Sequence, residues 1–270
     1  MLSALSPARR RLVIALLAGV AVLVLMAVAA TVRQWQAGSA DFQPAAQDVP
    51  GPVLLVPGYG GATSALEELA ATLQARGRDA TVVQLPGSAT GDMREQADAL
   101  DDAAVAAMER TGAATVDVVG HSAGGVVARL WVRQDGGSVA RRVVTLGSPH
   151  HGTSIARVAR DLVPKSCPVA CRQLSPDSDL LRDLNGDDET PAGPLFVSIW
   201  TRVDRVVTPP RSARLSGAVN VQVQAVCPGS RVEHGDLPRD RRVQAMVLAE
   251  LGTATPVVPR TCERVGAQRS

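Results

Sequence analysis

Short β-branched runs alternate with amphipathic stretches along most of the chain. Strand-like runs lie near residues 52–56, 80–85, 115–119, 142–146, 195–201 and 220–226. Apolar residues recur at helical spacing near residues 64–75, 92–110, 123–134 and 239–251. This alternation predicts an α/β fold with about six mainly parallel strands and helices on both faces of the sheet. In such a sheet, functional residues are expected at the carboxyl ends of the strands.

The N-terminus has a different pattern. Residues 12–30 form an uncharged apolar run preceded by Arg9, Arg10 and Arg11. The run is about as long as the roughly 20 residues that cross a bilayer, and basic residues on this side predict a cytoplasmic N-terminus. Ala27-Val28-Ala29 would suit signal-peptide cleavage, but the length favours an uncleaved anchor. Either predicts an exported protein, anchored to the outer face of the cytoplasmic membrane or secreted.

The sequence divides into four segments. They are a signal anchor or signal peptide (1–36), a linker (37–51), an α/β domain (52–252) and a C-terminal tail (253–270). Within the domain, residues 148–194 are irregular and rich in proline, and an irregular stretch of that length is usually functional. We therefore expect a cap over a pocket. Ile155, Val158 and Leu162 recur on one helical face there, where they would line the pocket or pack onto the sheet.

Composition excludes some classes of function. Hydrophobic residues make up 46% of the chain, which suffices for a large core, but aromatic residues make up only 2%. So few aromatic side chains argue against surfaces that stack single-stranded nucleic acid or sugars. The net charge is +2 and the arginines are scattered, so no nucleic-acid partner is expected.

The cysteines agree with export. Cys167, Cys171, Cys227 and Cys262 form an even set, for which sequence alone allows three pairings. The favoured pairs are Cys167–Cys171, closing a tight loop in the cap, and Cys227–Cys262, holding the tail to the last strand. A zinc site is disfavoured, because the spacing of Cys167 and Cys171 has no second paired motif.

Residues 115–125 read TVDVVGHSAGG, a strand-like run that ends in Gly-x-Ser-x-Gly and passes into a helical stretch. Glycines at positions 120 and 124 permit a tight strand-to-helix turn. This context predicts a nucleophile elbow, which exposes the Ser122 hydroxyl above the sheet. The alternative, a Gly/Ser loop with a passive serine, fits the flanking strand and helix less well.

An elbow serine needs a base, and the chain has four histidines. His121 adjoins the serine and is expected to point away from its hydroxyl and pack beneath the elbow. His150 and His151 lie too early, because chains with this elbow carry the acid and then the histidine after the serine. His234 alone leaves room for an acid and is the predicted base. The alternative for His234 is a loop histidine exposed to solvent.

The acid is expected just past the strand at 195–201. Asp204 is the only carboxylate between that strand and Pro209, so it is the predicted partner of His234. Arginines flank it, and the alternative is a surface ion pair worth at most about 1 kcal/mol. Asp117 lies inside the elbow strand and is expected to be structural.

Backbone N–H groups would stabilise the oxyanion that such a serine creates. One is expected from Ala123, the residue after the serine, and the other from Tyr59 in the loop PGYGG at 57–61. A glycine-rich loop could instead bind phosphate, but no Gly-Lys-Ser/Thr follows. No metal or organic cofactor is expected.

Together these motifs resemble the α/β-hydrolase superfamily. The segments that carry the resemblance are VPGYGG, VDVVGHSAGG, GSPHHGT, VDRVVTP and HGDLP. Over about residues 50–252 the chain is most similar to small secreted bacterial lipases and esterases, the class 2 triacylglycerol lipase group. Many relatives have His-Gly where this chain has Pro57-Gly58, and Pro57 lacks an N–H but leaves that of Tyr59 in place.

The resemblance implies an α/β-hydrolase fold preceded by one hydrophobic N-terminal helix. It also implies an exported serine hydrolase that cleaves carboxylic esters, above all acyl lipids, through Ser122, His234 and Asp204 and an acyl-enzyme. The membrane would be a partner through the N-terminal helix if it is uncleaved. An acyltransferase or thioesterase with the same triad is the first alternative, and a non-catalytic binding module is the second.

Overall fold

The computed structural model describes residues 19, 21, 22, 24 and 26 and residues 44–262. The chain forms two units, Met1–Gln43 and Pro44–Ser270. The five described residues of the first unit are helical. Among the described residues, no helix has the length and apolar character needed to span a membrane. Most of the predicted hydrophobic segment at 12–30 lies outside the described residues, as does the first part of the linker.

The second unit is built on a six-stranded sheet with the strand order β2-β1-β3-β4-β5-β6. The strands are β1 (Val53–Val56), β2 (Ala80–Val82), β3 (Val116–His121), β4 (Ala140–Leu146), β5 (Leu195–Trp200) and β6 (Val219–Gln222). Every neighbouring pair is parallel. All residues of β1 and β4 are buried, as expected for parallel strands covered on both faces. The predicted fold class is confirmed.

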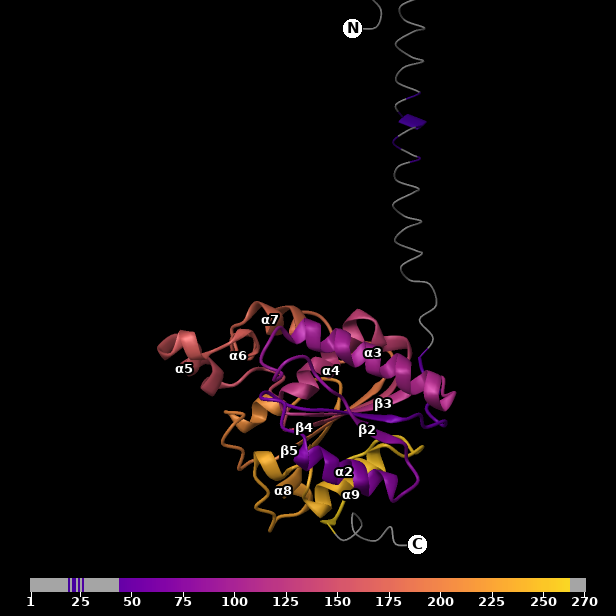
Figure 1. The fold of residues 1–270 in the computed structure, drawn as a ribbon, viewed down its shortest axis with the longest axis vertical. Coiled ribbons are helices and arrows are strands. Elements are labelled where there is room, and N and C mark those ends of the chain that lie inside the picture. Colours follow the sequence, from indigo (N-terminus) through magenta and orange to yellow (C-terminus); the bar gives the residue numbers. More distant parts are fainter. Residues whose placement is uncertain (1–18, 20, 23, 25, 27–43, 263–270) are drawn as a thin grey trace, which may run out of the picture. The chain divides into compact units, whose positions relative to one another are not determined.

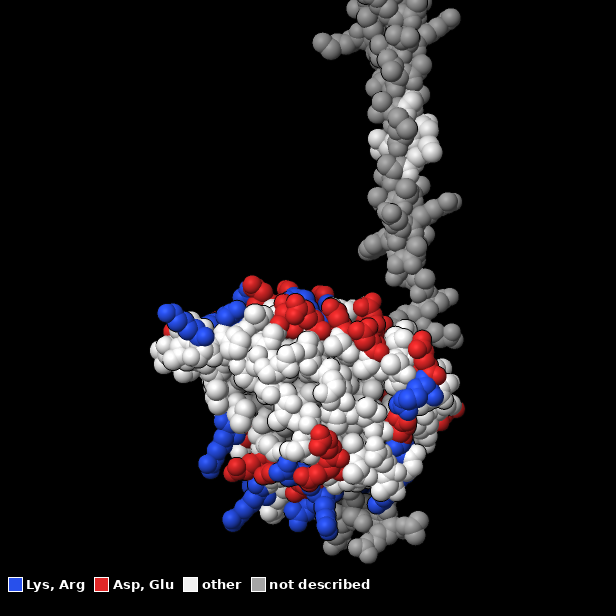
Figure 2. All heavy atoms as spheres, viewed as in Figure 1, with Lys and Arg blue, Asp and Glu red and all other residues white. Residues whose placement is uncertain are grey.

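Helices cover both faces of the sheet (Figure 1). One layer holds α3 (Met93–Thr111) and α4 (Ala123–Gln134), and the other holds α2 (Ser64–Gln74) and α9 (Arg241–Glu250). Each layer has its own apolar core: Leu100 and Trp131 belong to the first, and Leu69 and Met246 to the second. Acidic side chains gather over α3, and both signs of charge gather over α2 and α9 (Figure 2). The polar sides of these helices therefore face outward.

The segment between β4 and β5 is more ordered than its prolines suggested. It contains α5 (Ser154–Leu162), α6 (Val169–Gln173) and α7 (Asp179–Asn185). We call residues 154–185 the cover. Gln173 Oε1 accepts the Met93 N–H at 2.9 Å, and the Ala170 N–H donates to the Thr90 carbonyl oxygen at 3.1 Å, so α6 is attached to the start of α3.

The apolar face of α5 corrects one of the two expectations for it. Ile155, Val158 and Leu162 are 49%, 54% and 75% exposed, so none of them packs onto the sheet. Helix α5 stands out at the edge of the domain in Figure 1. Pro164 explains why α5 ends at Leu162, because proline disfavours helical backbone at the residue before it and cannot continue the hydrogen-bonded helix.

The last predicted strand was too long. Strand β6 ends at Gln222, and Val223–Val226 form the short helix α8. Val223 and Val226 lie one helical turn apart and are both buried in the second core. A β-branched run satisfies either a buried strand or one turn of buried helix, so the sequence pattern could not separate them.

All four cysteines are paired. Cys167 is bonded to Cys171, and Cys227 to Cys262. These are the two pairs that the sequence favoured. The first lies within the cover, and the second joins the end of α8 to the C-terminal tail.

Candidate active site

Ser122 occupies the turn between β3 and α4. Its backbone has φ 53° and ψ −125°, a region that non-glycine residues rarely adopt. The Ser122 N–H donates to the Leu146 carbonyl oxygen at 2.9 Å, which holds the turn against β4. A Cβ at Gly120 would lie 2.5 Å from Gly125, and one at Gly124 would overlap the Val56 carbonyl oxygen. The two glycines are therefore required by close packing, and the strained serine is placed at the sheet's carboxyl edge.

The structure brings Ser122, His234 and Asp204 into one hydrogen-bonded line. His234 Nε2 lies 2.9 Å from Ser122 Oγ, and His234 Nδ1 lies 2.8 Å from Asp204 Oδ2. A carboxylate only accepts hydrogen bonds, so Nδ1 carries the hydrogen and Nε2 is left to accept the serine O–H. His234 opens the short 3₁₀ turn η5 (His234–Asp236) and is buried, not exposed as in the alternative. This arrangement can move a proton from the serine hydroxyl to the imidazole.

Asp204 is buried at the loop that follows β5. Its Oδ1 accepts the N–H groups of Val206 and Val207, both at 2.8 Å, which leaves Oδ2 for the imidazole. Its only ion-pair partner among residues 44–262 is His234, so it does not pair with the flanking arginines. The loop's own backbone thus fixes the carboxylate for the histidine.

None of the other three histidines is hydrogen-bonded to Ser122 in the structure. His150 is fully buried, and its Nε2 is hydrogen-bonded to Thr145 Oγ1 at 3.1 Å. Burial lowers the pKa of His150 well below its ordinary value. His151 is exposed and pairs with Glu189 at 2.9 Å. His121 lies against the predicted base: its Nε2 is 3.1 Å from the His234 carbonyl oxygen, and the two rings are 5.1 Å apart. Sequence reasoning did not foresee that contact.

The loop after β1 passes directly beside the nucleophile. A Cβ at Gly58 would lie 2.9 Å from Ser122 Cβ, so only glycine allows this approach. Tyr59 follows and lines the same cavity as Ser122. Ala123 is the first residue of α4, and the first N–H groups of a helix have no partner within it. Both predicted oxyanion donors therefore lie at the site.

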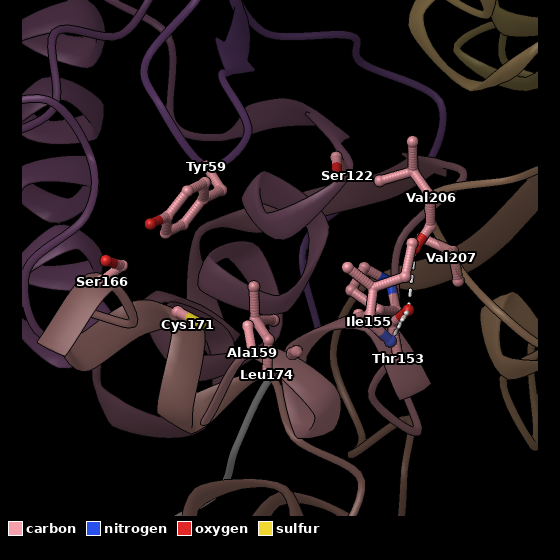
Figure 3. Close-up of a pocket in the computed structure, with 12 residues that line it drawn as sticks. Tyr59, Ser122, Thr153, Ile155, Ala159, Ser166, Cys171, Leu174, Val206 and Val207 are labelled. Carbon is pink, nitrogen blue, oxygen red and sulfur yellow. Dashed lines mark hydrogen bonds between the residues drawn. The ribbon is translucent and has the colours of Figure 1, made fainter. Parts of the chain in front are cut away.

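An apolar cavity of about 240 Å³ opens at Ser122. The cover contributes Ile155, Ala159, Cys171 and Leu174 to the lining of this cavity. Of the three residues on the apolar face of α5, Ile155 lines the cavity as expected, and Val158 and Leu162 do not. Figure 3 shows Tyr59 on the opposite side of the cavity from Val206 and Val207, which follow Asp204 in the chain. An apolar group bound here would lie between the cover and the acid loop.

Thr153 is a further site residue that the sequence reasoning missed. Its hydroxyl donates to the Val206 carbonyl oxygen at 2.7 Å and accepts the Thr208 N–H at 3.1 Å (Figure 3 shows the first bond). It therefore fastens the start of the cover to the acid loop. The signal available was the segment GSPHHGT, which follows the predicted strand at 142–146 and ends in Thr153.

Comparisons with known proteins give the same fold. A family model described as the alpha/beta hydrolase fold matches residues 51–166. No curated protein matches the chain. The α/β-hydrolase fold that the motifs implied is confirmed.

Solved structures with this fold include two lipases. Lipase B of Aspergillus fumigatus has a TM-score of 0.67 at 20% identity, over 80% of this chain and 55% of that one. A lipase of Bacillus licheniformis in its propeptide form has a TM-score of 0.64 at 18% identity, over 81% and 53%. This chain therefore spans little more than half of the length of either lipase. A putative cell surface hydrolase from Lactobacillus plantarum has a TM-score of 0.55 at 17% identity, over 82% and 98%. At these identities the likeness is one of fold.

Proposed function

We propose that this chain, which has the α/β-hydrolase fold, is an exported serine hydrolase that cleaves carboxylic esters of acyl chains. The observation that carries the proposal is the hydrogen-bonded line from Ser122 Oγ through His234 to Asp204, with distances of 2.9 and 2.8 Å. A strained serine beside a buried imidazole and a fixed carboxylate is the arrangement that activates a hydroxyl nucleophile.

In the first half of the reaction, Ser122 Oγ attacks the ester carbonyl while His234 Nε2 takes its proton. The N–H groups of Tyr59 and Ala123 hold the negative charge that develops on the carbonyl oxygen. Asp204 stabilises the imidazolium, which then gives its proton to the departing alcohol. In the second half, His234 Nε2 removes a proton from water as the water oxygen attacks the acyl carbonyl. The imidazolium then gives that proton to Ser122 Oγ as the bond between Oγ and the acyl carbon breaks, which releases the carboxylic acid and restores the serine.

The apolar cavity supports an acyl chain as the bound group. Its walls are mostly apolar and contain no charged side chain, which suits an alkyl chain better than a charged or sugar group. Two of the similar structures are lipases, which agrees with an acyl ester as substrate. The two disulfides favour an oxidising location outside the cytoplasm.

The proposal is tested by ester turnover with Ser122→Ala as the matched variant. Purified protein should hydrolyse p-nitrophenyl esters of graded chain length, and the variant should lose this activity while keeping the thermal unfolding of the wild type. An added alcohol tests the acyltransferase alternative, because transfer would give a new ester in place of free acid. Full activity in Ser122→Ala, or none in folded wild type across the panel, would refute the proposal.

A further inference from the structure

The predicted base lies in a segment with little regular structure of its own. His234 begins a 3₁₀ turn of three residues, between the loop after α8 and helix α9. Its two ring hydrogen bonds keep their length only if the backbone of this loop is fixed. Other residues must therefore hold the loop, and side chains within residues 44–262 attach it in two places.

The first attachment comes from the nucleophile's own strand. His121 ends β3, and its Nε2 lies 3.1 Å from the His234 carbonyl oxygen. A carbonyl oxygen only accepts, so Nε2 must carry the hydrogen and donate it. Because His121 is covalently joined to Ser122, this bond sets the backbone of the base relative to the nucleophile.

His121 is suited to remain a neutral donor. Burial, with a smaller contribution from the neighbouring His234, lowers the pKa of His121 to about 4. The two rings are only 5.1 Å apart, so a charged His121 would repel the imidazolium that forms on His234 during the reaction. A neutral ring holds the loop without opposing that charge.

The second attachment joins the base loop to the acid loop. The Thr201 hydroxyl donates to the Val232 carbonyl oxygen at 2.8 Å. The buried Gln224 of α8 donates through Nε2 to Thr201 Oγ1 at 2.7 Å and to the Ser230 carbonyl oxygen at 3.4 Å. Its Oε1 accepts the Arg202 N–H at 3.0 Å. The Gln224 side-chain amide is therefore hydrogen-bonded to both loops. Its partners lie at least two residues from Asp204 and from His234 along the chain.

We propose that His121 and Gln224 are positioning residues, of which His121 holds the base to the nucleophile and Gln224 holds the base loop to the acid loop. The proposal rests on the proposed function, since positioning matters to turnover only if the three residues catalyse it. Neither side chain is among those lining the cavity at Ser122. Their loss should therefore change kcat and leave KM near its original value.

The kinetic test compares three variants with one control, all in the full-length protein. His121→Phe keeps a ring but removes the donor, and His121→Gln restores an N–H near the position of Nε2. Gln224→Met removes the amide oxygen and the NH₂ group and leaves a side chain of similar volume. Gln96→Met is the control, because Gln96 is also buried and donates to a backbone carbonyl, that of Gly91, but on α3.

His121→Phe and Gln224→Met should each lower kcat by about 10- to 100-fold, since small misplacements of reacting groups cost that much. His121→Gln should recover most of the loss. Gln224→Met should also move the acidic limb of kcat/KM to lower pH, because a loosened carboxylate stabilises the imidazolium less. Gln96→Met should keep the kcat and pH profile of the wild type. If the first two variants match this control, the proposal is wrong.

Histidine NMR separates a failure of positioning from a failure of function. The chain has only four histidines, so ¹⁵N-histidine labelling gives few signals to assign. In the wild type, His121 should show a protonated Nε2, and His234 a protonated Nδ1 that exchanges slowly with water. That exchange should become faster in Gln224→Met and in His121→Phe. Unchanged His234 signals would refute positioning even in an active enzyme, and changed signals in a protein without esterase activity would refute only the proposed function.

Discussion

His234 Nε2 lies 2.9 Å from Ser122 Oγ, although 112 residues separate the two along the chain. The contact arises because β3 and the loop after α8 both end at the carboxyl edge of one parallel sheet. Strain at Ser122 is tolerated because β3, α4 and the neighbouring β4 determine the turn completely. Hydrolysis by this chain would depend on this contact, because the imidazole must take the proton of the serine hydroxyl.

Replacement of Asp204 tests the orienting carboxylate. Asp204→Asn should keep the fold, because the amide oxygen can still accept the N–H groups of Val206 and Val207. It should lower kcat by about 10³- to 10⁴-fold, since an amide no longer selects the required imidazole tautomer or stabilises the imidazolium. Asp236→Asn, which changes an exposed acid two residues from His234, is the control and should retain activity. Equal activity of the two variants would mean that Asp204 has no catalytic part.

The two disulfides should have separable effects. Cys171 lines the cavity at Ser122, so Cys167→Ser/Cys171→Ser should alter the preference for acyl chain length. Cys227→Ser/Cys262→Ser opens a link between residues 35 apart in the sequence and should cost about 4 kcal/mol of unfolding free energy, with chain-length preference retained. Ester panels and denaturant unfolding measure the two effects. If the two double variants have the same preference for acyl chain length, the cover does not select the substrate.

A buried charge cluster below the site should stabilise the fold without affecting chemistry. Asp117 Oδ2 accepts from Arg78 and from Arg141, each at 2.6 Å, and both Asp117 and Arg141 are fully buried. Asp117→Asn should lower the unfolding free energy by about 3–5 kcal/mol, because it leaves a buried guanidinium uncompensated.

The control for that variant is Asp79→Asn. Asp79 pairs with the exposed Arg110, so this substitution should lower the unfolding free energy much less than Asp117→Asn does. Urea titrations followed by tryptophan fluorescence compare the two. If both variants lose a similar amount of unfolding free energy, burial of the Asp117 ion pairs does not contribute to stability.

Glu250 should make stability depend on pH near neutrality. Burial raises the pKa of its carboxyl to about 7, from an ordinary value of 4.5. Between these values the folded state binds more protons than the unfolded state, so the unfolding free energy falls as pH rises through this window. Glu250→Gln removes the titration, so the variant should exceed the wild type in stability above about pH 7, and the difference should shrink toward about pH 5.

The matched control for Glu250→Gln is Glu68→Gln, which changes an exposed carboxylate on α2. Denaturant midpoints measured across the pH range compare both variants with the wild type. If the two variants show the same pH dependence, burial of Glu250 is not its cause.

The sequence predicted those parts of the site that depend on local backbone requirements. Gly120 and Gly124 mark the elbow because no other residue fits there, and Asp204 and His234 follow predicted strands in the expected order. The hydrogen-bond partner of His121 could not be predicted, because it depends on where a loop more than 100 residues away comes to lie. The same holds for Gln224, whose role is visible only once α8 replaces the end of the predicted strand.

The apolar face of α5 shows another limit of sequence reasoning. The spacing of Ile155, Val158 and Leu162 indicated one helical face but not what that face contacts. In the structure only Ile155 of the three lines the cavity. Periodicity identifies an amphipathic helix, whereas its partner is set by tertiary packing.

The most direct test of the central claim is to map the site of covalent modification by a fluorophosphonate. We expect one adduct per chain, on Ser122, formed at a rate that falls sharply in His234→Ala, because the imidazole activates this hydroxyl. Peptide mass spectrometry locates the adduct. A folded wild-type protein that stays unmodified, or one modified at another residue while Ser122 is free, would contradict it.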